Sequence, residues 1–162
     1  MTEEQFKTLF DTHFDAIRRY LYYRSGDKVL STDLAQDTFL RIWEKQLNPD
    51  PIKDVGLLYK IAGDLFISHI RRAQKGREII SELKVELTQR SPEEELQYKE
   101  LKGKYERVLR EMPENQRTVF LMSRMEQLTY QEIAERLSLG VKAIEKRMSA
   151  ALMLLRKELK SQ

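Results

Sequence analysis

Apolar residues recur along most of the chain at steps of three and four positions, which is the spacing of amphipathic helices. Residues 2–26 form the first such segment, and Gly26 is a suitable stop because glycine adopts left-handed backbone angles easily. One face of this segment is apolar: Phe6, Leu9, Phe10, Phe14, Ile17 and Leu21. The pattern predicts a long helix that packs along one side.

Two further helices are predicted in the first half of the chain. Residues 31–46 form a periodic segment that opens with Ser31 or Thr32 as an N-cap. The stretch 48–54 contains two prolines, which cannot continue a helix. A third helix is therefore expected over 55–75.

The third predicted helix carries apolar residues on two of its sides. The stripes are Leu58, Ile61, Ala62, Leu65 and His69 on one side, and Tyr59, Phe66 and Ile70 on the other. A small domain can bury only one stripe in its own core. The second is expected to cover a partner, to stack on bases of single-stranded DNA, or to lie under another helix.

The second half of the chain repeats the helical pattern after a polar stretch. Helices are predicted from about 93 to 112 and from 114 to 125. The predicted fold class is all-α, with two small helical domains joined by a linker. The first domain covers 1–75, the linker covers 76–95, and the second domain covers 96–162. Within the linker, the spacing of Ile79, Leu83 and Leu87 suits either local packing or docking of a partner.

The stretch "TYQEIAERLSLGVKAIEKRMSAA", residues 129–151, predicts two helices joined by a tight turn. Thr129 and Glu132 form a capping box at the start of the first helix. The second helix has a buried face of Val141, Ile144, Met148, Ala151, Leu152 and Leu155. Its opposite face is polar and mostly basic. A short helix, a turn and a longer basic helix predict a helix-turn-helix unit that binds DNA.

Charge is distributed unevenly along the 162 residues, whose net charge is +3. Residues 51–80 carry 6 basic and 3 acidic side chains, and residues 137–162 carry 6 and 2, so these segments have net charges of +3 and +4. Residues 1–50 carry 7 and 9, and residues 81–136 carry 10 and 12, so each of these has a net charge of −2. Two separated basic segments suit a protein that touches a polyanion at two places.

Several functional classes find little support in the sequence. The chain has no cysteine, which excludes disulfides and thiol chemistry and suits a reducing cytoplasm. His13 and His69 lack the spacing of metal ligands, so no enzyme activity, metal, cofactor or small-molecule substrate is expected. No apolar run is long enough to span a membrane, and the acidic N-terminus is unlike a signal peptide.

Three segments together resemble the extracytoplasmic-function (ECF) sigma factors, the bacterial initiation factors that recruit RNA polymerase to promoters. "DLAQDTFLRIWE" (33–44) is similar to the polymerase-binding helix of that family. "LLYKIAGDLFISHIRR" (57–72) resembles its promoter-melting helix, which contacts the −10 element. "MPENQRTVFLMSRMEQLTYQEIAERLSLGVKAIEKRMSAAL" (112–152) is similar to its second domain, which binds the −35 element.

The resemblance implies three groups of contact residues. The residues expected to bind core RNA polymerase are Asp33, Gln36, Asp37, Leu40, Arg41 and Trp43. Those expected at the −10 element are Tyr59, Lys60, Asp64, Ile67, Arg71 and Arg72. Those expected at the −35 element are Lys142, Ala143, Lys146, Arg147 and Ser149. The loop 45–56 corresponds to the place where relatives hold a flipped −10 base, and an anti-sigma factor, often membrane-anchored in this family, is an expected partner.

The chain departs from the family pattern at several positions. The family more often has arginine where this chain has Gly63, and asparagine where it has Asp64. Ala150 and Leu152 replace frequent arginines in the second domain. The turn residue that is usually glycine is Ser138. These departures imply the function of the family with an altered promoter sequence.

Some alternatives stay open at the level of sequence. Trp43 could anchor a partner or belong to the core. The second DNA-binding unit alone would also suit a freestanding helix-turn-helix regulator, which would bind duplex DNA tightly without polymerase. A helical adaptor with no role in DNA binding would not depend on Lys142 or Lys146.

Overall fold

The structure is a computed structural model that describes residues 1–73, 83–85 and 95–160. The described residues form seven α-helices and no strand, which confirms the predicted all-α fold class. The helices are α1 (Glu3–Ser25), α2 (Lys28–Glu44), α3 (Val55–Arg72), α4 (Glu95–Glu111), α5 (Glu114–Glu126), α6 (Tyr130–Leu137) and α7 (Val141–Lys160). Within the described ranges, none of these helices is long and apolar enough to cross a membrane.

Capping residues determine where α1 begins and ends and where α2 begins. Thr2 caps α1 through a capping box with Gln5, and Gly26 ends the helix with φ 70° as predicted. The predicted start of α2 at Ser31 or Thr32 was wrong, because α2 begins at Lys28 with Asp27 as its N-cap. The Asp27 carboxylate accepts a hydrogen bond from the backbone N–H of Leu30 at 3.0 Å, and this bond fixes the earlier start.

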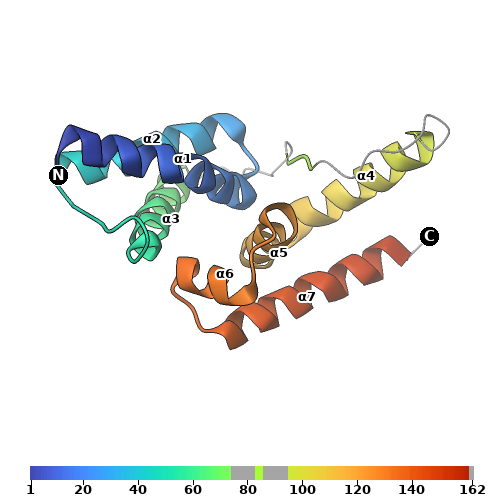
Figure 1. The fold of residues 1–162 in the computed structure, drawn as a ribbon. Helices are drawn as coiled ribbons and strands as arrows, with labels where there is room; N and C mark the ends of the chain where they lie inside the picture. Colours follow the sequence, from blue (N-terminus) through green and yellow to red (C-terminus); the bar gives the residue numbers. More distant parts are fainter. Residues whose placement is uncertain (74–82, 86–94, 161–162) are drawn as a thin grey trace.

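Helices α1, α2 and α3 pack into the first domain, at the blue and green end of Figure 1. Apolar side chains from all three helices fill its core, including Leu9, Ile17, Leu21, Leu34, Phe39, Ile42, Leu58 and Ala62. An aromatic cluster extends this core along α1, with Phe10 stacked on Phe14 at 4.6 Å between ring centroids. The ring of Phe6 lies 5.2 Å from that of Trp43, so Trp43 packs at the edge of the core.

Helices α4 to α7 form the second domain. Its buried residues include Val108, Leu109, Val119, Phe120, Leu121, Ile133, Ile144, Met148, Ala151 and Leu155. The apolar faces of α6 and α7 point into this core, as their periodicity predicts. Helix α7 extends beyond the domain core alongside α4 (Figure 1).

The two domains are in direct contact in the structure. Helix α1 packs against α5, and α3 packs against α6. A short piece of the linker, residues 83–85, is also held at this contact, with Leu83 and Val85 buried. The backbone N–H of Lys84 donates to the Tyr22 hydroxyl at 2.9 Å, and that of Val85 donates to the Glu106 carboxylate at 2.8 Å. Of the apolar linker residues predicted to pack locally or to dock a partner, Leu83 is buried at this contact, whereas Ile79 and Leu87 lie outside the described residues.

Candidate polymerase and nucleic-acid interfaces

Helix α2 turns one face into the core and leaves the opposite face exposed. Ala35, Phe39 and Ile42 are buried, as the sequence pattern predicted. The residues expected to bind polymerase lie on the exposed side: Asp33, Gln36, Asp37, Leu40 and Arg41. Leu40 is 52% exposed, which leaves a large apolar side chain between charged neighbours. Trp43 is half-buried against Phe6 at the edge of the core, and its role as an anchor for a partner stays a prediction.

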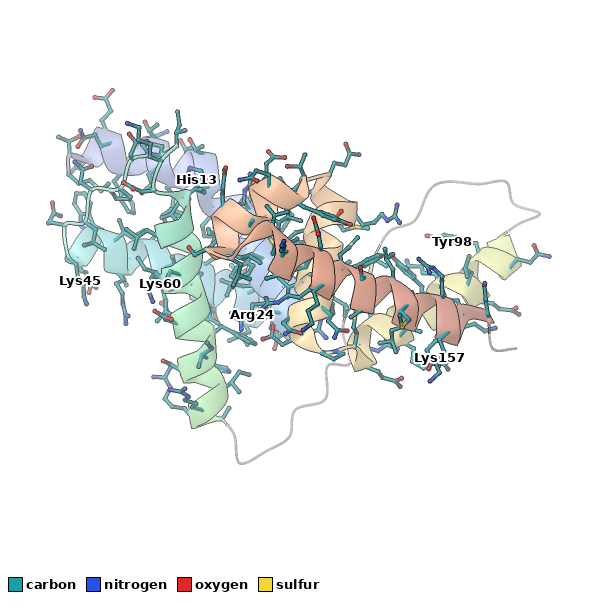
Figure 2. All side chains as sticks on the ribbon, turned by 90° about the horizontal axis from the view of Figure 1, so that it is seen from below. His13, Arg24, Lys45, Lys60, Tyr98 and Lys157 are labelled. Carbon is teal, nitrogen blue, oxygen red and sulfur yellow. The ribbon has the colours of Figure 1, made fainter. Side chains whose placement is uncertain are left out.

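Of the six residues of α3 expected at the −10 element, five are exposed and one is buried. The exposed group consists of Lys60, Asp64, Ile67, Arg71 and Arg72. Lys60 lies on the side of α3 that faces away from the second domain (Figure 2), and it forms an ion pair of 3.2 Å with Asp64 along the helix. Tyr59 is only 2% exposed and does not join this group.

The second apolar stripe of α3 lies largely under other parts of the same chain. Tyr59 packs edge-on against Tyr20 of α1, with ring centroids 5.0 Å apart. Its hydroxyl also accepts a hydrogen bond of 3.2 Å from Arg136 of α6. The ring of Phe66 is covered by the Arg24 guanidinium at 4.6 Å. Only Ile70 of this stripe stays exposed, at 47%.

An open hollow of about 570 Å³ lies between the start of α1 and the loop before α3. Its walls come from Thr2, Gln5 and Thr8 on one side, and from Asn48, Asp50 and Asp54 on the other. The loop is shaped by Asp50, whose carboxylate accepts hydrogen bonds from the backbone N–H groups of Ile52 and Lys53. These bonds hold the pKa of Asp50 below its usual value. The loop side of the hollow therefore contains a hydrogen-bonded turn, and Met1, Leu9, Pro49 and Pro51 add apolar lining.

Helices α6 and α7 have the helix-turn-helix geometry that the sequence predicted. Thr129 and Glu132 form the capping box, with hydrogen bonds of 2.9 and 3.1 Å. Ser138 occupies the turn with φ 55°, a left-handed conformation that glycine adopts more readily than serine. The backbone N–H of Ser138 donates to the carbonyl of Ala134, which closes the first helix.

The first turns of α7 present most of the residues expected at the −35 element. Lys142, Lys146 and Ser149 are exposed, and Ala143 and Arg147 are half-buried. Arg147 lies close to α1: burial raises the pKa of Tyr20, and the positive charge of Arg147 is among those that oppose this rise. Among the described residues, no group of three or more His, Asp or Glu side chains is arranged to hold a metal ion.

A buried arginine joins the two domains, and sequence reasoning missed it. Arg117 of α5 is 1% exposed and donates to two carbonyls of the second domain, those of Leu109 and Met112, at 3.2 and 3.1 Å. It also donates to the carbonyls of Tyr23 and Arg24, in the last turn of α1, at 2.6 and 2.7 Å. Burial lowers the pKa of Arg117 to about 10, which still leaves it charged at neutral pH. The sequence signal that could have indicated a buried arginine was a cationic side chain within the apolar pattern of residues 114–125.

Comparison with known proteins gives the same assignment for both domains. The family model for sigma-70 region 2 matches residues 9–76, and the model for sigma-70 region 4 matches residues 102–155. The ECF RNA polymerase sigma factor SigM of Bacillus subtilis is 28% identical over 76% of this chain and 76% of its own length. The ECF sigma factor SigE of Mycolicibacterium smegmatis is 30% identical over 80% of this chain, which spans about half of that relative.

A solved structure has a similar fold along nearly the whole chain. It is the sigma factor RpoE of Bartonella quintana in complex with the anti-sigma factor NepR. The likeness has a TM-score of 0.66, with 21% sequence identity, and covers 97% of this chain and 98% of that one. The order of regions 2 and 4, their helices and these relatives agree, and the chain belongs to the ECF sigma factors, the initiation factors that direct RNA polymerase to promoters.

Proposed function

We propose that this sigma factor binds core RNA polymerase through the exposed face of α2 and grips promoter DNA at two places. Helix α3 and the hollow beside it contact the −10 element, and the start of α7 contacts the −35 element. The observation that carries the proposal is the exposure of three separate groups of residues, one on each of these helices. Each group combines charged side chains with at least one small or apolar contact residue.

The polymerase surface on α2 has the chemistry of a helix that docks on another helix. Leu40 supplies an exposed apolar contact, and Asp33 and Asp37 supply acidic groups one turn apart from each other. The occupant that we propose is a pair of helices in the largest polymerase subunit. Because Leu40 is already exposed in the free chain, its truncation should affect binding far more than folding.

The −10 contact combines cations for phosphate with a recess for a base. Arg71 and Arg72 lie at the end of α3, where they can reach the backbone of a melted strand. The hollow beside Asp50 lies at the loop that corresponds to the flipped-base site of relatives, and its backbone-ordered wall suits a polar base edge. Asp64 is an acceptor, so it would favour the exocyclic amino group of cytosine or adenine.

The −35 contact rests on the first turns of α7 in a major groove. Lys142 and Lys146 are one turn apart, and both are exposed on the same side of the helix. Such cations contact phosphates or guanine edges. Small side chains at Ala143 and Ser149 allow the helix to approach the bases closely.

The remaining partners and the site of action follow from the proposed role. Polymerase and promoters are cytoplasmic in bacteria, so we expect this protein to act there and to catalyse no reaction of its own. A relative of similar fold was solved with an anti-sigma factor. We therefore expect a regulatory protein of that class to hold this chain inactive, either free or at a membrane.

The decisive experiment is in vitro transcription with bacterial core polymerase, this protein and genomic fragments, followed by sequencing of the transcripts. Specific starts that share two upstream elements are expected. Leu40→Ala and Asp37→Lys should lower polymerase affinity at least tenfold, whereas Val29→Ala is the matched control because Val29 is 72% exposed on the same helix outside this segment. Tight binding to duplex operators with no effect of polymerase would instead favour a freestanding helix-turn-helix regulator.

A further inference from the structure

Helix α1 turns one row of side chains toward the loop that joins α2 to α3. Gln5, Leu9 and His13 follow one another at steps of four residues, so they lie on one face of the helix. Gln5 and Leu9 line the hollow between α1 and the loop. His13 is half-buried one turn further along, beside the start of α3 (Figure 2). The row therefore continues from the hollow to the His13 ring.

The His13 ring is bonded to the loop. Its Nε2 atom lies 2.7 Å from the carbonyl oxygen of Pro51, which is 38 positions away in the sequence. Because a carbonyl oxygen can only accept, Nε2 carries the proton and donates it. Pro51 lines the hollow, whereas His13 lies outside that lining. His13 therefore acts on a molecule in the hollow through the loop.

The loop tip, residues 50–54, is a preformed unit. The Asp50 carboxylate accepts hydrogen bonds of 2.9 and 2.8 Å from the backbone N–H groups of Ile52 and Lys53. The backbone N–H of Asp50 donates to the Asp54 carboxylate at 2.7 Å, and that of Asp54 donates to the Asp50 carbonyl at 3.0 Å. The ring of Pro51 fixes its own φ. A bond at Pro51 therefore sets the place of the whole tip.

The chain before the tip is anchored in the domain core, but the tip is not. Leu47 packs against the core, and Pro49 is buried. Residues 50–54 are all exposed, and Ile52 reaches 86%. Apolar packing therefore contributes little to where the tip lies. The hydrogen bond from His13 is the contact that holds it against α1.

We propose that His13 is a positioning residue for promoter reading: its bond to Pro51 fixes the loop tip against α1 and so determines which base fits the hollow. The inference rests on the proposed function, because it assumes that the hollow takes a base of the −10 element. A base in the hollow meets polar groups of α1 on one side and of the loop on the other. Discrimination between bases then depends on the distance between the two walls.

Two substitutions separate the hydrogen bond of His13 from the bulk of its ring. His13→Gln keeps an N–H donor about as far from Cα as Nε2, whereas His13→Met has a similar length and no donor. Both residues are good helix formers, so α1 should be retained in each variant. Thr12→Ala is the neighbouring control, because the Thr12 hydroxyl donates within α1, to the carbonyl of Thr8 at 2.7 Å.

Nuclear magnetic resonance on the free, full-length protein tests the bond itself. The sequence has two histidines, so His69→Gln leaves ring signals from His13 alone. The Nε2-protonated ring is expected. In His13→Met, the backbone order parameters of Ile52 and Lys53 should fall below about 0.6, and in His13→Gln and Thr12→Ala they should not. A ring protonated on Nδ1 alone, or an unchanged tip in His13→Met, would overturn the proposal.

Promoter discrimination tests the consequence for function. Holoenzyme assembled with bacterial core polymerase is given promoters in which each −10 position carries each of the four bases in turn, and open complexes are measured. The preference for the best base should fall about fivefold at one position in His13→Met, and less than about twofold in His13→Gln and Thr12→Ala. Base preference at the −35 element and affinity for core polymerase should stay unchanged in all three variants.

The outcomes separate the role of His13 from the proposed function. Equal losses of preference in His13→Gln and His13→Met would mean that the ring only packs, which would overturn the positioning role. A loosened tip with unchanged base preference would overturn it as well. If the unsubstituted protein directs no specific transcription, the proposed function itself fails, and the resonance spectra still decide whether His13 holds the loop.

Discussion

Arg136, in the helix-turn-helix unit, donates a hydrogen bond of 3.2 Å to the hydroxyl of Tyr59, on α3 of the other domain. The guanidinium also lies 5.9 Å from the centre of the Tyr59 ring. Burial is the main cause that raises the pKa of Tyr59, so the phenol stays protonated at neutral pH. A residue of the helix-turn-helix unit is therefore bonded to the buried side of α3.

Tyr59→Phe should weaken this contact with little change in packing. It removes the acceptor of a charged donor and keeps the buried ring, so we expect a loss of about 1 kcal/mol in the free energy of unfolding. Urea unfolding followed by circular dichroism measures it. Tyr105→Phe is the control, because that ring packs on Phe120 within the second domain and should change stability by less than about 0.5 kcal/mol. Equal losses in both variants would mean that the Arg136 bond contributes nothing.

Arg117→Ala should be the most destabilising single change in the second domain. It leaves four carbonyl oxygens without their donor and opens a cavity at the ends of α1 and α4. A loss of about 3 kcal/mol or more is expected in urea unfolding. Arg117→Lys keeps the charge but cannot reach all four carbonyls, so an intermediate loss is expected. A loss below about 1 kcal/mol for Arg117→Ala would contradict the role of the buried guanidinium.

Ser138→Gly should stabilise the helix-turn-helix unit. Ser138 has φ 55°, and a residue with a Cβ is disfavoured there by about 1 kcal/mol, whereas glycine is not. The melting temperature should rise by a few degrees. Ser138→Ala is the matched control, because it removes the hydroxyl but retains the strained backbone. If both substitutions raise the melting temperature equally, the backbone is not the cause.

Lys142→Ala and Lys146→Ala should weaken promoter binding by the holoenzyme mainly through phosphate contacts. For each lost phosphate contact, the negative slope of the logarithm of the binding constant against the logarithm of the salt concentration should become shallower by about 0.9. Fluorescence anisotropy with a promoter fragment over a series of KCl concentrations measures this slope. Lys157→Ala provides a control, because Lys157 is exposed at the far end of the same helix (Figure 2). Unchanged slopes for both variants would place this face away from the DNA.

Regular periodicity was enough to predict most helices, since each buries one apolar face. The helix-turn-helix unit was predictable because its capping box and its two apolar faces are all local signals. The start of α2 was not, because Asp27, Ser31 and Thr32 can each cap a helix. In the structure Asp27 caps it through Leu30, and Ser31 is buried inside the helix. Local sequence does not contain that information.

The contact between the two domains could not be predicted from the sequence. Tyr59 and Phe66 form an apolar stripe that is covered by residues distant in sequence. Arg136, more than 70 positions away, covers Tyr59, and Arg24, about 40 positions away, covers Phe66. Arg24 and Glu114 gave no sign of their pairing, because both types are common on solvated helix surfaces. Only Gly63 hinted at a special requirement, and it acquires meaning only once Arg24 is seen beside it.

Gly63 is buried on the side of α3 that faces Arg24 and Tyr20 of α1. It leaves room for the Arg24 guanidinium, which donates to Tyr20 on its own helix and to Glu114 on α5. A larger side chain at this position would therefore act first on the contact between the two domains, and only through that contact on the exposed residues of α3.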